Sequence, residues 1–177
     1  MKFKDTEYGD LTGQHYDSGI DVSNMGLSSL EGAPKSVQHD FICDNNNLES
    51  LKYSPETVYG DFSCAKNSLT SLKGAPKIVG GHFWCTNNEL TSLVGGPLTV
   101  HGDYDCDRNN ITTLKGIPKE LEYNLWCDDN PNPNLIDEWN FRKENPNMTE
   151  DEIKEKMFEL TGDDDYLSDE AKDIFLF

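Results

Sequence analysis

The sequence has no long hydrophobic run and few basic residues. None of its apolar runs approaches the roughly 20 residues that a membrane-spanning helix needs, so we expect no transmembrane segment. Lys and Arg number 15 against 33 Asp and Glu, which gives a formal net charge of −18. Nucleic acids and anionic membranes are polyanions that repel such a surface. The charge therefore argues against direct binding to either of them and favours basic protein partners.

The start of the chain also lacks an apolar stretch. Met1-Lys2-Phe3-Lys4 is followed by acidic and polar residues, so we expect no secretory signal. Cysteines number only five, and an odd count without such a signal is typical of a reduced intracellular protein. We therefore expect a cytoplasmic location.

The cysteines that are present fall at a fixed interval of 21 residues, and other positions repeat with them. A large apolar residue stands two positions before each cysteine, an asparagine three after it and a leucine eight after it. The repeated cysteines are Cys43, Cys64, Cys85, Cys106 and Cys127. An earlier, degenerate unit begins at Ile20 and carries Val22 in the cysteine position. A period in the twenties is the signature of a solenoid, which predicts about six stacked units over residues 20–133.

Each unit contains signals for one strand and two turns. The alternation Phe62-x-Cys64 predicts a short strand whose apolar side is buried. Asn67 follows where the chain must turn, and stacked asparagines are expected to form a ladder that binds the turn amides of neighbouring units. Glycine and proline in the return limbs, as in Gly74-Ala75-Pro76, disfavour helices there. The sequence thus predicts a parallel β-sheet on one face and non-helical return limbs built of turns or short 3₁₀ pieces.

This pattern resembles the leucine-rich repeat, L-x-x-L-x-L-x-x-N/C-x-L, with Cys64 in a leucine slot and Asn67 in the Asn slot. More narrowly, it resembles the SLxGAPxxVxGDFxCxxNxLTSL repeats of tailed bacteriophage and some bacterial proteins. The resemblance covers about residues 20–135 and departs from the pattern at Tyr53-Ser54, where Gly-Ala is usual, and at Asn132-Pro133. It implies a leucine-rich repeat solenoid, a scaffold that serves many binding functions.

The two ends of the chain lack the repeat. Residues 1–19 are polar and rich in turn formers, so we expect an N-terminal cap with room for one short strand. Residues 134–177 are expected to form an acidic, helical C-terminal cap that closes the open end of the core. Residues 128–177 hold 16 acidic and 5 basic residues, so −11 of the net charge lies there.

Three helices are predicted in this C-terminal cap. The first follows a proline-rich turn at Leu135 and ends near Asn145-Pro146. The second begins at the capping box Thr149-x-x-Glu152. Its apolar face is predicted from helical spacing to consist of Ile153, Met157 and Leu160. Ser168 can cap a last helix that ends in the apolar run 174–177.

The outward positions of the predicted sheet carry acidic and aromatic side chains. If Phe62 and Cys64 point inward, then Asp61, Ser63 and Ala65 point outward, and the same slots can be read in every unit. The resulting candidate partner-binding residues are Asp40, Asp44, Asp61, His82, Trp84, Asp103, Asp105, Asp107, Trp126 and Asp128. Exposed tryptophans are enriched at interface hot spots, and the carboxylates suit an Arg- or Lys-rich partner. The alternative is that terminal segments cover the tryptophans and the aspartates only keep the sheet soluble.

Metal binding and catalysis find little support in the sequence. Stacked strands place successive cysteines about 4.8 Å apart, so a zinc site or a disulfide is geometrically possible. Zinc sites, however, use C-x-x-C pairs, which are missing here, and we expect buried thiols that act as small hydrophobes. Asp103-x-Asp105-x-Asp107-x-Asn109 resembles part of a calcium loop, but Arg108 and Leu114 replace its Gly and Glu. No catalytic set is complete, so we expect no enzyme activity, metal or cofactor.

The favoured function is therefore protein binding. By its resemblance to phage repeats, the chain is expected to be a phage protein that binds a host protein in the host cytoplasm. Such a protein is expected to inhibit a defence or nucleic-acid-handling enzyme. Two alternatives stay open. The acidic C-terminal helices would imitate nucleic acid in one, and the chain would assemble with copies of itself in the other.

Overall fold

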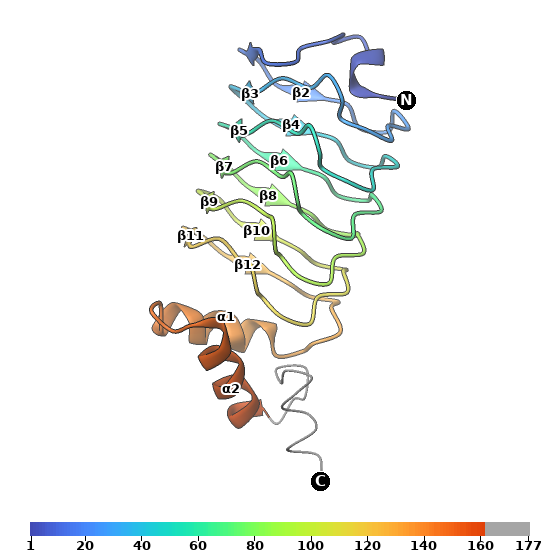
Figure 1. Cartoon of the computed structure of the whole chain (residues 1–177). Coiled ribbons are helices and arrows are strands. Elements are labelled where there is room, and N and C mark those ends of the chain that lie inside the picture. Colours follow the sequence, from blue (N-terminus) through green and yellow to red (C-terminus); the bar gives the residue numbers. More distant parts are fainter. Residues whose placement is uncertain (162–177) are drawn as a thin grey trace.

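The computed structural model of the chain describes residues 1–161, which wind into a parallel β-solenoid with two helices at its C-terminal end (Figure 1). The predicted repeat solenoid with a helical C-terminal cap is confirmed. Each turn contributes a two-residue strand to each of two six-stranded parallel sheets. The even sheet comprises β2 (Ile20–Asp21), β4 (Phe41–Ile42), β6 (Phe62–Ser63), β8 (Phe83–Trp84), β10 (Tyr104–Asp105) and β12 (Leu125–Trp126).

The second sheet was not foreseen from the sequence. This odd sheet lies in the return limbs, where only turns or 3₁₀ pieces were expected. It comprises β1 (His15–Tyr16), β3 (Ser36–Val37), β5 (Thr57–Val58), β7 (Ile78–Val79), β9 (Thr99–Val100) and β11 (Glu120–Leu121). In β3, β5, β7 and β9 the second residue is a valine without solvent exposure, which packs into the core from the side opposite the even sheet. Every strand pairs in register with the residue 21 positions away, as Phe41 does with Phe62.

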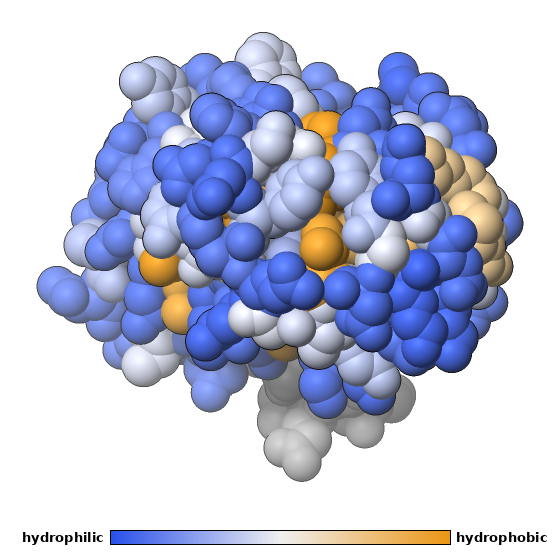
Figure 2. Space-filling view, turned by 90° about the horizontal axis from the view of Figure 1, so that it is seen from above, coloured by the Kyte–Doolittle hydropathy of each residue, from blue (hydrophilic) through white to orange (hydrophobic). Residues whose placement is uncertain are grey.

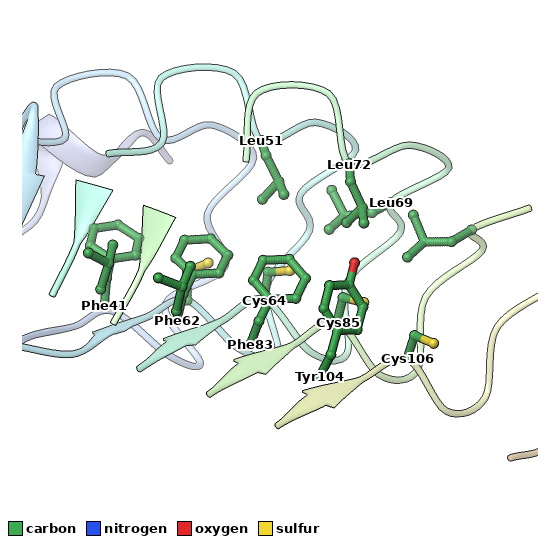
Figure 3. Close-up of a cluster of buried hydrophobic side chains, with 14 of the residues drawn as sticks. Phe41, Leu51, Phe62, Cys64, Leu69, Leu72, Phe83, Cys85, Tyr104 and Cys106 are labelled. Atoms are coloured by element: carbon green, nitrogen blue, oxygen red, sulfur yellow. The ribbon is translucent and has the colours of Figure 1, made fainter. Parts of the chain in front are cut away.

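The core is narrow and built from side chains that stack on similar side chains of the next turn (Figure 3). The rings of Phe41, Phe62, Phe83 and Tyr104 lie one above the next, with successive centroids 5.8, 5.5 and 4.8 Å apart. The five cysteines stack beside them and are free thiols, all buried. Their expected role as small hydrophobes is confirmed. Burial raises the pKa of every one of these thiols, and that of Cys127 to about 12.

The predicted asparagine ladder is also confirmed. Asn67 accepts a hydrogen bond from the Leu48 N–H of the preceding turn at 3.0 Å. Its Nδ2 donates to the carbonyl oxygens of Cys43 and Cys64, each at 3.1 Å. The same bonds recur at the other repeat asparagines, which are Asn46, Asn88, Asn109 and Asn130. The ladder thus satisfies buried backbone groups that no regular strand or helix would pair.

The N-terminal segment closes the first turn of the solenoid. Phe3, in the 3₁₀ turn η1 (Phe3–Asp5), has no solvent exposure and stacks on Phe41 with ring centroids 6.2 Å apart. Lys2 and Lys4 both form ion pairs with Glu31, at 2.7 and 2.6 Å. Figure 2, seen from this end, shows mostly hydrophilic atoms around a few hydrophobic ones. The segment therefore hides the apolar end of the core, as the terminal unit of a solenoid must.

Two helices cover the other end. Helix α1 (Leu135–Glu144) and helix α2 (Glu150–Thr161) have the boundaries expected from the proline-rich turn and from the capping box. In that box the Thr149 N–H donates to Glu152 Oε2 at 2.8 Å, and the Glu152 N–H donates to Thr149 Oγ1 at 3.3 Å.

The apolar face expected for α2 is partly wrong. Ile153 and Met157 are buried against Phe141 of α1, whereas Leu160 is 68% exposed, because α2 is packed along a narrow stripe only. The last helix, expected after Ser168, lies outside the described residues. No helix among residues 1–161 is long and apolar enough to cross a membrane.

Candidate protein-binding face

The outer side of the even sheet presents three columns of side chains that run along the solenoid. The first column stands three residues before each cysteine, the middle column one residue before it and the last column one residue after it. All ten predicted partner-binding residues belong to these columns, and the structure places them on one face. Their hydrogen bonds divide them into two groups.

Side chains of the first column bind the backbone of the next turn. Asp40 Oδ1 accepts from the Asp61 N–H at 2.8 Å, and Asp61 Oδ1 accepts from the His82 N–H at 2.7 Å. His82 Nδ1 then accepts from the Asp103 N–H at 3.0 Å, and Asp103 Oδ1 from the Asn124 N–H at 3.0 Å. Since Nδ1 is an acceptor, the neutral His82 ring carries its proton on Nε2. These four side chains hold successive turns together.

In the last column, two aspartates also accept hydrogen bonds from the backbone of the next turn. Asp44 Oδ1 accepts from Ser63 Oγ at 2.5 Å and from the Ala65 N–H at 2.9 Å. Asp107 Oδ1 accepts from the Asp128 N–H at 2.6 Å. Both carboxylates are partly buried, and this desolvation raises their pKa above the ordinary value for aspartate. Sequence reasoning treated these aspartates as free surface charge. The sequence signal for these bonds is an acceptor side chain that recurs in the same slot of successive turns, because each such side chain can reach the backbone N–H of that slot in the next turn.

The middle column carries the two tryptophans. Strand register pairs Asp105 with Trp84 on one side and with Trp126 on the other. Trp84 stacks on His82, with ring centroids 5.4 Å apart and the planes 8° from parallel. Trp126 is 49% exposed. A carboxylate thus lies between two indoles on one surface.

Asp105 is held in this position by its own local contact. Its Oδ1 accepts from the Asp107 N–H at 3.0 Å, and burial raises its pKa. The arrangement provides apolar rings and negative charge side by side, the combination that receives a guanidinium or ammonium group through cation–π and ionic contacts.

The face is not open along its whole length. Ser63 and Ala65 were expected to point into solvent, yet they are only 2% and 8% exposed. Ser63 pairs with Ile42 and with Trp84 in the neighbouring strands, and these larger side chains flank it on both sides. The face is therefore closed around Ser63 and Ala65. Trp126 and Asp128 are exposed at its C-terminal end and Asp40 towards its N-terminal end, whereas Trp84 and Asp105 are half-buried.

Metal-ligating residues do not gather on this face. Within residues 1–161, no group of three or more His, Cys, Asp or Glu side chains has an arrangement that could hold a metal ion. Comparison of the chain with protein-family models, with curated proteins and with solved structures found no match.

Proposed function

We propose that this chain is a non-enzymatic protein-binding module, and that the C-terminal half of its even sheet binds a basic segment of a partner protein. The observation that carries the proposal is the arrangement of Trp84, Asp105 and Trp126 in one column of that face. An indole left 49% exposed, as in Trp126, is a typical anchor at the centre of an interface.

Several carboxylates of the helical cap already have basic partners within the cap. Glu138 and Glu150 both contact Arg142, and Glu159 forms an ion pair with Lys156 at 2.5 Å. A nucleic-acid mimic needs carboxylates that are free to meet a basic groove. Asp137, Glu144, Asp151 and Glu155 are exposed on the same helices, and imitation of nucleic acid through them is the second candidate.

The kind of partner rests on the repeat pattern. Resemblance to the repeats of tailed bacteriophage proteins supports a phage protein that binds and inhibits a host defence or nucleic-acid-handling protein in the host cytoplasm. The acidic surface supports a target with a basic site, since complementary charge accelerates and orients such encounters.

The test is an affinity pull-down of the tagged chain from bacterial lysate, followed by mass spectrometry and by titration calorimetry with the enriched protein. Trp126→Ala should weaken binding by about 2 kcal/mol or more, roughly 30-fold in Kd. The matched control is Tyr59→Ala, because Tyr59 is also exposed (55%) but follows β5 of the odd sheet. Equal binding by both variants and the wild type would rule out the even sheet as the binding surface.

Salt separates the two candidates further. Exposed charges more than about 8 Å apart are screened at physiological ionic strength. An interface anchored by tryptophans should survive moderate salt. A nucleic-acid mimic should instead capture many nucleic-acid-binding proteins at low salt and release them at moderate salt. Its binding should also weaken when the acidic residues of α2 are neutralised. A self-associated chain without any partner would leave only the structural role.

A further inference from the structure

One histidine stands among the aspartates of the first column. Asp40, Asp61 and Asp103 each accept a hydrogen bond from a backbone N–H of the next turn through a carboxylate. His82 accepts instead through Nδ1, from the Asp103 N–H at 3.0 Å. A carboxylate accepts whenever it is ionised, whereas a histidine nitrogen accepts only in the neutral ring. Histidine is also the side chain whose charge ordinarily changes between pH 5 and 8, so this one link between turns depends on pH in that range.

Protonation of the His82 ring removes the link to the next turn. The side chain is 41% exposed, so protons reach it from solvent. In the charged ring both nitrogens carry a proton, and Nδ1 then directs its N–H at the Asp103 N–H. Asp103 Oδ2 lies 3.5 Å from Nδ1, and a small rotation of the ring brings the new donor onto this carboxylate in a charge-assisted hydrogen bond. The Asp103 N–H is left without its acceptor.

The charged groups on both sides of the ring are mainly acidic. In the preceding turn, Asp61 Oδ1 accepts from the backbone N–H of His82 at 2.7 Å. In the following turn lie Asp103 and Asp105, and Arg108, whose charge also acts on Asp105, has its own acidic partner one turn further on. Within residues 1–161, His82 is the only basic side chain that forms an ion pair with any of these three aspartates. Its protonation therefore decides the charge of this part of the face.

The His82 ring also covers one side of Trp84. The two rings are stacked, with centroids 5.4 Å apart and planes 8° from parallel. When the imidazole is charged, this stack becomes a cation–π contact, so the cation that occupies the indole belongs to the chain itself. Asp105 pairs in register with Trp84 and lies beside the new positive charge. A basic side chain of a partner then meets a weaker negative field at the same place.

We propose that His82 is a pH-sensitive switch of the even-sheet face. The neutral ring ties β8 to β10 and leaves the face acidic. The protonated ring releases the Asp103 N–H, pairs with the Asp103 carboxylate and places a positive charge against Trp84. A basic segment therefore binds more weakly as the pH falls. This effect on binding rests on the proposed function, whereas the exchange of hydrogen bonds does not.

Nuclear magnetic resonance of the isotope-labelled full-length chain tests the exchange of hydrogen bonds without any partner. At pH 8 the ring should carry its proton on Nε2, and a scalar coupling across the hydrogen bond should join the Asp103 amide nitrogen to His82 Nδ1. At pH 5 this coupling should be lost and the Asp103 amide signal should shift. In His82→Asp, which places the usual residue of the column there, the Asp103 amide should shift far less. A proton on Nδ1 at pH 8, or a coupling that persists in the charged ring, would overturn the proposal.

The effect on binding is measured by titration calorimetry with an acetylated, amidated hexa-arginine peptide, whose charge is constant over this pH range. Its Kd for the wild type should rise about 3- to 5-fold between pH 8 and pH 5.5, the size of one exposed charge pair. His82→Asp should bind it with nearly the same Kd at both pH values. The matched control is His101→Gln, because His101 is similarly exposed but follows β9 of the odd sheet and pairs with Glu122, and this variant should respond to pH like the wild type.

The two proposals fail in different ways. An equal Kd of the wild type at both pH values would show that His82 does not control the face, even where the face binds the peptide. A wild type that does not bind the peptide at pH 8 would count against the proposed basic partner. The coupling between Asp103 and His82 would still decide whether the hydrogen bond responds to pH.

Discussion

Glu138 Oε1 accepts a hydrogen bond from the backbone N–H of Leu114 at 3.0 Å. One turn earlier, the Leu93 N–H donates to the carbonyl of Lys115 in the next turn, also at 3.0 Å. The position 21 residues after Lys115 already belongs to α1, so a side-chain carboxylate of that helix takes the place of the carbonyl at Leu114. Glu138 has no solvent exposure, and Arg142 Nε donates to the same oxygen at 2.8 Å. One buried side chain thus attaches the cap to the last turn.

Glu138→Ala should therefore lower the free energy of unfolding by about 3 kcal/mol, because it leaves a buried N–H unpaired and removes the acidic partner of Arg142. Glu138→Gln keeps an oxygen that accepts from the Leu114 N–H, and Arg142 still has Glu150 as an acidic partner. The free energy of unfolding of this variant should therefore fall by about 1 kcal/mol or less. Urea unfolding followed by circular dichroism measures both. Glu144→Ala, at an exposed position of the same helix, is the control. An equal loss of stability in all three variants would contradict the proposal that Glu138 attaches the cap to the last turn.

Tyr53 has a backbone φ of 73° at a position where the other turns have glycine. The corresponding glycines are Gly32, Gly74, Gly95 and Gly116, with φ between 88° and 99°. A left-handed conformation costs an L-residue about 1–2 kcal/mol, and the extra freedom of an unfolded glycine offsets about 0.5–1 kcal/mol of that. Tyr53→Gly should thus stabilise the chain by up to about 1 kcal/mol, since the side chain is 49% exposed and little packing is lost.

Thermal unfolding measures this gain. Tyr59→Gly is the control, because Tyr59 is similarly exposed but has no positive φ, and glycine there should cost about 0.5–1 kcal/mol. A loss of similar size in both variants would show that Tyr53 is not strained.

Much of the fold follows from the 21-residue period. The 21-residue spacing of the cysteines placed the even strands, and the repeated asparagines placed the ladder, because each stacked position meets its own kind in the next turn. The odd sheet could not be found in this way. A strand of two residues, such as Ile78–Val79, is too short to show a period-two alternation, and Pro76 just before it favoured a turn.

The candidate face was predictable only in part. Its residues could be placed on one side of the sheet because side chains alternate along a strand. The hydrogen bonds of Asp40, Asp61 and Asp103 to the following turn could not be deduced from alternation, because they depend on the spacing between turns. The burial of Ser63 depends likewise on the size of the neighbouring Ile42 and Trp84, which are remote in sequence.

Tyr104 is the one tyrosine in a ring stack of phenylalanines. Its hydroxyl is buried and has no nitrogen or oxygen partner among the described residues, and the Cys85 thiol beside it is a weak acceptor at best. Tyr104→Phe should raise the free energy of unfolding by about 1 kcal/mol, because it removes a desolvated hydroxyl and keeps the ring. The reciprocal variant Phe83→Tyr should lower it, and urea unfolding measures both. A destabilised Tyr104→Phe would show that the hydroxyl has a stronger partner than this sulfur.

Asp44 gives the stability of the chain a defined pH dependence. Burial raises its pKa in the folded state, and the nearby Asp21 carboxylate adds to the rise, although hydrogen bonds from Ser63 and Ala65 oppose it. The folded chain therefore holds this proton more tightly than the unfolded chain, whose aspartates have a pKa of about 3.9. The contribution of Asp44 to the free energy of unfolding is therefore fully present below the unfolded-state pKa. It is lost as the pH rises through the folded-state pKa.

Asp44→Asn removes this titration but keeps an oxygen that accepts from the Ala65 N–H. The variant should be more stable than the wild type at pH 7, and the two should converge below pH 4. Asp10 provides the opposite case, because hydrogen bonds from Thr12 lower its folded pKa and its stabilisation is lost as the pH falls. Asp10→Asn should thus be less stable than the wild type at pH 7 and equal to it at low pH. Unfolding of the three proteins in urea between pH 3 and 7 gives the comparison. If Asp44→Asn were the less stable at pH 7, the ionised carboxylate would stabilise this face despite its burial.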